Sequence, residues 1–379
     1  MTEFKLNRRR RILALVLPIC LWIPVNGNAF SDPVTLSIGS PAPDFNLPGV
    51  DGKNHKLSDF ADARVLVVVF TCNHCPTAQA YEQRIKDLVQ DYRARGVALV
   101  AISPNDPKAV RLDELGYTDL GDSFEEMKIR AQDQSFNFPY LYDGDEEKVS
   151  RAYGPTSTPH LFIFDSGRKL RYAGRLDDSE RPDKVKSSDA RNAIDALLAG
   201  RPVRVEKTKT FGCSIKWSDK RASVKAAFQE WASEPVSLQT IDEAGIRKLV
   251  RNDSKKLRLI NVWATWCGPC VIEFPELVAI NRMYRGREFE FVTISADAPE
   301  NKDQALVFLK KQQASSSNYI FSIDDKYKLV EAVDKEWPGA LPYTILVEPG
   351  GKVIYRVQGE LSPLELKKAI VARLGRYYP

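Results

Sequence analysis

The chain has 379 residues, which at roughly 100–200 residues per domain predicts two or three domains and excludes a single small module. Hydrophobic residues make up 43% of the chain and aromatic residues 10%, which excludes a largely disordered chain, a collagen and a polytopic membrane protein. The formal net charge is +5, but residues 1–29 hold five basic residues against one acid, so the remainder carries only +1. A nearly neutral body has no general attraction for phosphates, and we expect no nucleic-acid partner.

The first 29 residues have the order of an export signal. Four consecutive arginines, Arg8 to Arg11, precede the apolar stretch Ile12 to Val25, and small or polar residues follow up to Ala29. We therefore expect residues 1–29 to be a signal peptide, and the protein to be exported to the periplasm or another extracytoplasmic space. The apolar stretch has 14 residues, fewer than the about 20 that a helix needs to cross hydrocarbon, so an uncleaved anchor is the second alternative.

The first cysteine pair, Cys72 and Cys75, lies between a predicted strand and a predicted helix. The continuous apolar run 65–70 is typical of a strand buried on both faces, and a helical pattern covers 78–95. We expect the unpaired amides and positive end of the helix to lie beside the first cysteine of this pair, and of the second pair described below, where they favour the nucleophilic thiolate. The second cysteine would then resolve the captured disulfide.

Further along, Thr158-Pro159 precedes a predicted strand at 160–164, and a proline that opens a strand can follow a cis peptide bond. Cys213 has no nearby cysteine in the sequence. It is either buried and inert or a third redox thiol that forms a mixed disulfide with Cys72 or Cys75. The polar segment 219–237 reads as a linker, either a short amphipathic helix or a loose tether.

The second half repeats this order. A predicted strand at 257–263 precedes Cys267 and Cys270, a helical pattern covers 272–284, and Leu341-Pro342 precedes a strand at 343–347. Two Cys-x-x-Cys pairs could share a zinc ion, but zinc knuckles use short hairpins, and a strand-to-helix setting favours a redox pair. Covalent haem is excluded because neither pair is followed by histidine.

The repeated order resembles the thioredoxin fold. The expected fold class is therefore α/β, with two tandem thioredoxin-like folds, each a central mixed sheet flanked by helices, after the signal segment. Residues 238–379 resemble the TlpA/ResA type of extracytoplasmic thioredoxin through the run Asn261 to Cys270 and the following Glu273-Phe274-Pro275. The resemblance implies that Cys267 is the nucleophile, Cys270 the resolving thiol and Glu273 a proton-handling carboxylate, with Leu341-Pro342 as the cis-proline.

Residues 34–218 resemble the peroxiredoxin-like, AhpC/TSA-related proteins through the opening Pro41 to Phe45 and the motif Phe70 to Pro76. Peroxiredoxins place a threonine three residues before the peroxidatic cysteine, whereas counting back from Cys75 gives Cys72. The Cys75-Pro76 pair does match, so a thiol-dependent peroxidase is the alternative function of this half.

His74 lies immediately before the second cysteine, where the resemblance to the oxidising protein DsbA also places a histidine. A donor close to the Cys72 sulfur would stabilise the thiolate and make the disulfide a better oxidant. We therefore expect the Cys72–Cys75 couple to be more oxidising than Cys267–Cys270, and electrons to pass from the second pair to the first.

The sequence as a whole predicts a thiol–disulfide oxidoreductase that uses two redox-active disulfides and no metal or other cofactor. The expected substrate-binding residues are Thr158, Pro159, Leu341, Pro342 and Trp266. The expected partners are client protein thiols or disulfides and a membrane or extracytoplasmic electron donor, with a peroxide as the alternative substrate. A copper metallochaperone that uses Cys72, Cys75 and a histidine, His74 or His160, is the second alternative.

Overall fold

The computed structural model describes residues 1–2 and 33–378, so most of the expected signal peptide lies outside the described residues. The chain divides into a unit of residues 1–31 and a compact unit of residues 32–379, and the fold below is that of the second unit. Within the described part, none of the helices combines the length and apolar character needed to span a membrane.

The first module is built on a five-stranded mixed sheet. The strand order is β5-β4-β3-β6-β7, in which β3, β4 and β5 run parallel and β6 and β7 are antiparallel to their neighbours. The strands are β3 (Val65–Phe70), β4 (Val97–Ser103), β5 (Tyr140–Tyr142), β6 (His160–Phe164) and β7 (Leu170–Gly174). A short antiparallel pair, β1 (Asn46–Pro48) and β2 (Asn54–Lys56), precedes them. The strands predicted at 65–70 and 160–164 are confirmed.

Helices cover both faces of this sheet, which is why β3 is apolar along its whole length. Its odd-numbered residues pack in one core with α1 (Pro76–Tyr92) and α4 (Asp189–Leu198). Its even-numbered residues pack in a second core with α3 (Lys148–Tyr153). Helix α2 (Phe124–Asp133) begins at an N-cap serine, Ser123, whose hydroxyl accepts a hydrogen bond from Glu126 N.

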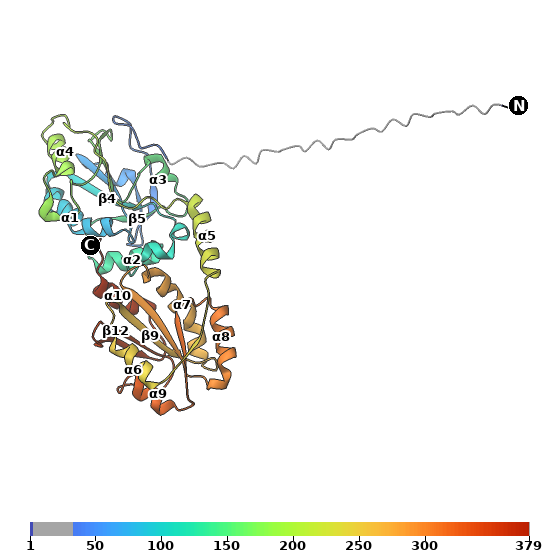
Figure 1. The fold of residues 1–379 in the computed structure, drawn as a ribbon. Helices are drawn as coiled ribbons and strands as arrows, with labels where there is room; N and C mark the ends of the chain where they lie inside the picture. Colours follow the sequence, from blue (N-terminus) through green and yellow to red (C-terminus); the bar gives the residue numbers. More distant parts are fainter. Residues whose placement is uncertain (3–32, 379) are drawn as a thin grey trace. The chain divides into compact units, whose positions relative to one another are not determined.

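The second module has a six-stranded sheet in the order β13-β12-β9-β10-β11-β8. Its strands are β8 (Gln239–Ile241), β9 (Leu257–Trp263), β10 (Phe289–Ser295), β11 (Ser317–Phe321), β12 (Tyr343–Val347) and β13 (Val353–Gln358). Its helices are α6 (Glu243–Arg251), α7 (Gly268–Tyr284), α8 (Lys302–Lys311), α9 (Lys326–Val333) and α10 (Pro363–Leu374). Helices α6 and α9 pack side by side on one face (Figure 1), and α7 and α10 pack on the other. The expected fold class, two thioredoxin-like modules with sheets flanked by helices, is confirmed.

The segment between the modules contains helix α5 (Arg221–Ala232) rather than a loose tether. Trp231 is buried. The guanidinium groups of Arg282 and Arg285, both from the second module, make cation–π contacts with its ring. At the other end of α5, Arg221 forms an ion pair with Asp106 of the first module. The helix therefore contacts both modules.

Direct contacts also join the two modules within the unit 32–379. The Tyr284 hydroxyl donates to the carbonyl oxygen of Thr118 at 2.7 Å, and Arg376 forms an ion pair with Asp119 at 2.6 Å. Thr118 and Asp119 belong to the first module, and Tyr284 and Arg376 belong to the second. These polar contacts join helix α7 and the segment after α10 to the first module.

Candidate redox sites

The site of the second module lies at the start of helix α7. Cys267 is the N-cap residue, and its sulfur accepts a hydrogen bond from the Cys270 amide at 3.3 Å. The two residues form a disulfide, in which Cys267 is 6% exposed and Cys270 1%. The side chain of Trp266 is largely exposed beside them. An incoming thiol therefore reaches the sulfur of Cys267 before that of Cys270.

Glu273 lies on α7 one turn after Cys270 and is half-buried. Burial raises the pKa of its carboxyl group to about 7, although hydrogen bonds from the Leu361 amide and the Asn261 side chain favour the carboxylate. A carboxyl group with this pKa can hold or release a proton near neutral pH, which fits the proton-handling role implied by the family resemblance.

Both predicted X-Pro sites have a cis peptide bond, Thr158–Pro159 and Leu341–Pro342. The residue after each proline pairs with the central strand of its sheet. His160 pairs with Phe70, and Tyr343 pairs with Val262. This shared register allows the two modules to be compared residue by residue.

Cys75 lies five positions after Phe70, and Cys267 lies five positions after Val262. Cys75 is therefore the counterpart of Cys267. Cys75 is also the N-cap of its helix, and its sulfur accepts from the Ala78 amide at 3.5 Å. Cys72 corresponds to Ala264 instead. The prediction that the helix start lies beside the first cysteine of each pair holds for Cys267 and is wrong for Cys72.

The physical reason is the position of proline in each motif. Proline is favoured in the first helical turn because it lacks an amide hydrogen that would be unpaired there anyway. In the first module Pro76 follows the second cysteine and begins helix α1, whereas Pro269 lies between the two cysteines of the second module, inside helix α7. The helix therefore starts after Cys75 in one module and after Cys267 in the other.

Cys75 lies in a buried cluster with Cys72 and Cys213. Its sulfur accepts a hydrogen bond from the Cys213 amide at 3.2 Å. Burial alone would raise the pKa of Cys75, but hydrogen bonds from the thiols of Cys213 and Cys72 and the charge of His74 bring it well below its usual value. Burial and the hydrogen bond to Cys75 raise the pKa of Cys72. These pKa shifts favour Cys75 over Cys72 as the thiolate, and the charge of His74 acts on Cys75, whereas the sequence predicts an effect of His74 on Cys72.

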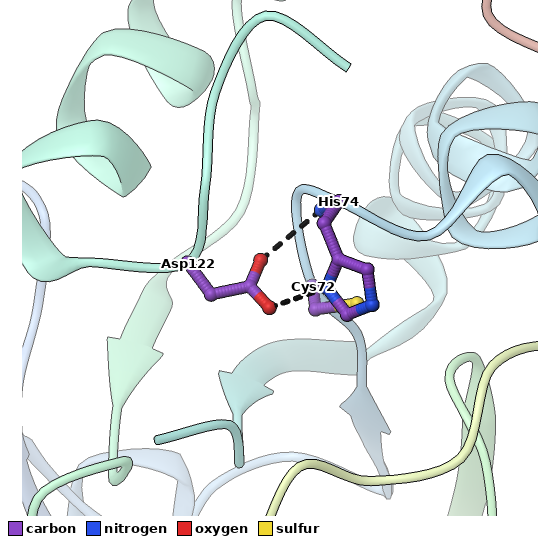
Figure 2. A group of neighbouring side chains, drawn as sticks. All are labelled: Cys72, His74 and Asp122. Atoms are coloured by element: carbon purple, nitrogen blue, oxygen red, sulfur yellow. Dashed lines mark hydrogen bonds and ion pairs between the residues drawn. The ribbon is translucent and has the colours of Figure 1, made fainter. Parts of the chain in front are cut away.

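His74 is fully buried and paired with Asp122, a residue that sequence reasoning missed. One carboxylate oxygen accepts from His74 Nδ1 at 2.5 Å and the other from the His74 amide at 3.1 Å, as Figure 2 shows. Burial lowers the pKa of His74, but the charge of Asp122 and its hydrogen bond raise it by more, which favours the cationic imidazole. The other ring nitrogen, Nε2, is buried without a hydrogen-bond partner. No spacing in the sequence could link the two, since they lie 48 residues apart.

Cys72, His74 and Asp122 form the group that could hold a metal ion, judged over the described residues, with ligand atoms within 4.8 Å of one another (Figure 2). Asp122 already accepts hydrogen bonds from the amides of Asn73 and His74 and the side chains of His74 and Asn105. A metal would have to displace several of these bonds. The carboxylate is therefore better placed to orient His74 than to bind an ion.

His160 is not part of that group. Its Nδ1 accepts from the Thr156 amide at 3.2 Å, and its ring stacks on Phe162. Burial lowers the pKa of His160 to about 4, so the ring is neutral near pH 7. The nearby Thr158 hydroxyl lies 3.1 Å from the Cys72 sulfur, which links the cis-proline loop to the thiol cluster.

The two modules match two different protein-family models. Residues 38–173 match the model of the AhpC/TSA family, and residues 236–370 match the Redoxin model. The thiol-disulfide oxidoreductase ResA of Geobacillus thermodenitrificans is 25% identical over 164 residues, which are 43% of this chain and 83% of that protein. A Mycobacterium tuberculosis protein provisionally named a peroxiredoxin is 29% identical over 121 residues, which are 31% of this chain and 66% of that protein.

Among solved structures, an uncharacterized conserved protein from Geobacillus kaustophilus is 38% identical, with 48% of this chain and 93% of that chain covered and a TM-score of 0.43. By these family models the first module is similar to the AhpC/TSA family and the second to the Redoxin family, both modules have a thioredoxin-like fold, and the relatives of the chain include thiol–disulfide oxidoreductases.

Proposed function

We propose that this protein is a thiol–disulfide oxidoreductase with two redox centres, one in each module. The observation that carries the proposal is the equivalence of Cys75 and Cys267. Each is the N-cap of a helix, at the same register position relative to a cis-proline. Amides at a helix start stabilise a thiolate, and the thiolate is the species that attacks disulfides.

In the second module Cys267 would attack the client disulfide and Cys270 would release the client. The cis-proline loops, Thr158-Pro159 and Leu341-Pro342, would bind an extended client segment through their backbone groups, with Trp266 as an exposed aromatic contact. The redox-active sulfurs would then be the protein's own cofactor.

The expected setting is extracytoplasmic, with client proteins as substrates and a membrane or extracytoplasmic protein as electron donor. Disulfide exchange outside the cytoplasm needs such a donor because the cytoplasmic thiol pools do not reach it. The export signal read from residues 1–29 supports this setting. Electrons would pass from Cys267/Cys270 to the first module.

Insulin reduction by the full chain tests the proposal, with dithiothreitol as electron source. Cys267→Ser should abolish the part of the activity that belongs to the second module, and Cys75→Ser the part that belongs to the first. A chain carrying Cys270→Ser should accumulate a mixed disulfide with its client. An unchanged rate in the double variant Cys75→Ser/Cys267→Ser would refute the proposal.

A thiol-dependent peroxidase remains the second candidate for the first module. It is favoured by the buried Cys75, which lies at the helix start and is followed by Pro76, as in the peroxidase Cys-Pro pair. Hydrogen peroxide consumption by the reduced full chain tests it. Loss of consumption in Cys75→Ser, with Cys267→Ser unaffected, would assign this activity to the first module.

A further inference from the structure

The thiol cluster of the first module contains a cysteine from a distant part of the chain. Cys213 follows Cys75 by 138 residues, yet its amide donates a hydrogen bond to the Cys75 sulfur at 3.2 Å, and its side chain packs against the cluster that contains Cys72 and Cys75. Cys75 thus has two candidate partners for a disulfide, the sequence neighbour Cys72 and the distant Cys213.

The position of Cys213 depends on a close approach between two backbone segments. The Thr158 amide donates to the Cys213 carbonyl oxygen at 2.9 Å, next to cis-Pro159. Gly212 has a φ of +130°, and a Cβ atom added there would lie 2.0 Å from the Thr158 carbonyl oxygen. Only glycine fits both requirements, so the sequence Gly212-Cys213 brings this thiol to the cis-proline loop.

The three cysteine residues differ in exposure. Cys75 is 0% exposed and Cys72 2%, whereas Cys213 is partly exposed. A surface pocket of about 500 Å³ adjoins the Cys213 segment, lined in part by Ser157, Phe211, Gly212 and Ser214. A Cys72–Cys75 disulfide would present neither sulfur to a protein reductant, but a Cys75–Cys213 disulfide would present one.

We propose that the working disulfide of the first module is Cys75–Cys213, and that an external dithiol reduces it by attacking the sulfur of Cys213, the partly exposed residue of the three. This inference rests on the redox function proposed above and replaces the expected Cys72–Cys75 pair. Cys72 then acts as a positioning residue, since it packs against Cys75 in the buried cluster and its sulfur lies 3.1 Å from the Thr158 hydroxyl.

The reductive step is a pair of exchanges. A thiolate of the external dithiol attacks the Cys213 sulfur, the Cys75–Cys213 bond breaks, and Cys75 leaves as a thiolate. The second thiol of the reductant then attacks the reductant's own sulfur in the mixed disulfide and releases Cys213, which takes up a proton. Two electrons have passed from the dithiol to the cysteine pair, and the reductant has become a disulfide.

The electrostatics favour this direction of attack. A thiol of low pKa leaves faster in disulfide exchange. The hydrogen bonds and the charge of His74 that lower the pKa of Cys75 therefore make it the better leaving group, while the hydrogen bond to Cys75 and burial raise the pKa of Cys213. Attack at the accessible sulfur thus releases the more stable thiolate.

Peptide mapping of the full chain tests the pairing. The chain carries Cys267→Ser and Cys270→Ser, is oxidised with diamide, alkylated with iodoacetamide and cut with trypsin. Cys72 and Cys75 fall in one peptide, residues 65–84, and Cys213 in another, residues 210–216. We expect a cross-link between the two peptides, retained with Cys72→Ser, lost with Cys75→Ser and unaffected by the control Ser214→Ala. Brief treatment of the oxidised chain with reduced glutathione should place the adduct on peptide 210–216.

A disulfide confined to peptide 65–84, with Cys213 alkylated, would overturn the pairing and leave the proposed redox function standing. No disulfide in either peptide would overturn both. A glutathione adduct on peptide 65–84 would overturn the route of attack. Fragment-ion sequencing of the cross-linked peptides from the chain with intact Cys72, Cys75 and Cys213 shows which of Cys72 and Cys75 is joined to Cys213, even where a variant of these residues fails to fold.

Discussion

The charge on His74 depends on one carboxylate. The ring and Asp122 are both fully buried, and a buried cation is stable only beside a partner that offsets its lost hydration. The same pair lies close enough to Cys75 for the cation to lower the pKa of that thiol. The reactivity of the first module therefore depends on Asp122 as well as on the cysteines.

Asp122→Asn removes the negative charge while keeping a side chain of similar shape. The pKa of His74 should fall, the neutral ring should be favoured at pH 7, and the pKa of Cys75 should rise because it loses the nearby positive charge. The pH dependence of iodoacetamide alkylation at Cys75, followed by mass spectrometry, measures this shift. Asp119→Asn is the matched control, because Asp119 is equally buried but pairs with Arg376. An unshifted alkylation profile in Asp122→Asn would contradict the role given to this pair.

The raised pKa of Glu273 predicts that the stability of the second module depends on pH. Its folded pKa of about 7 lies above the ordinary value of 4.5, so the folded chain binds this proton more tightly than the unfolded chain. The resulting stability is complete below pH 4.5 and is lost as the pH rises through about 7. Glu273→Gln cannot lose a proton, and its Tm should fall less than that of the parent between pH 5 and pH 8.

Scanning calorimetry of the oxidised chain measures the difference. A change of 1 kcal/mol corresponds to roughly 2–4 °C in a domain of 150–250 residues. Glu300→Gln, at an exposed position, should follow the parent profile. If Tm depends on pH in the same way for the parent and for Glu273→Gln, the Glu273 carboxyl group titrates alike in the folded and unfolded chain.

At the scale of elements, the start of helix α1 decides which cysteine becomes the thiolate. The first free amides of a helix point toward its N-cap, so only the N-cap side chain receives both their hydrogen bonds and the positive end of the helix. Cys75 holds that position in the first module and Cys267 in the second. Cys213 forms an antiparallel β-bridge with Thr158 of the cis-proline loop, which brings a third cysteine to the site.

Gly212→Ala tests this second element. The added methyl group would collide with the Thr158 carbonyl oxygen, and the residue would keep a strained positive φ. We expect a destabilisation of about 1–3 kcal/mol and loss of the Cys75–Cys213 cross-link. Gly200→Ala is the control. It also has a positive φ, but its Cβ would meet no atom within 4 Å, so it should lose some stability and keep the cross-link. Retention of the cross-link in Gly212→Ala would show that the close approach is not needed.

At the scale of the whole molecule, the two redox centres should differ in reduction potential. The low pKa of Cys75 stabilises the reduced form of the first module, and a more stable reduced form means a stronger oxidant. In glutathione buffers, the full chain with Cys267→Ser/Cys270→Ser should have a potential less negative than the chain with Cys72→Ser/Cys75→Ser/Cys213→Ser. We expect a gap of at least about 30 mV, or ~1.4 kcal/mol. Equal potentials, or the opposite order, would rule out electron transfer from the second module to the first.

Local patterns in the sequence were sufficient for most of the fold. The buried strand at 65–70, the strand at 257–263 and the two X-Pro strands are all present in the structure. The periodicity of apolar residues reports which elements form, because each element must bury its own apolar face. The same patterns led to Cys267 as the N-cap of α7, since the pair lies directly before that helix.

The chemical environment of the first site was decided only by the tertiary structure. Asp122 reaches His74 across 48 residues, and Cys213 reaches Cys75 across 138. Periodicity and motif spacing describe neighbours along the chain, whereas these contacts depend on how strands and loops from separate segments meet at one edge of a sheet. Thiol pKa values follow from burial, charge and hydrogen bonds in three dimensions. The sequence alone thus determined which elements form, while the meeting of distant segments decided which sulfur is reactive.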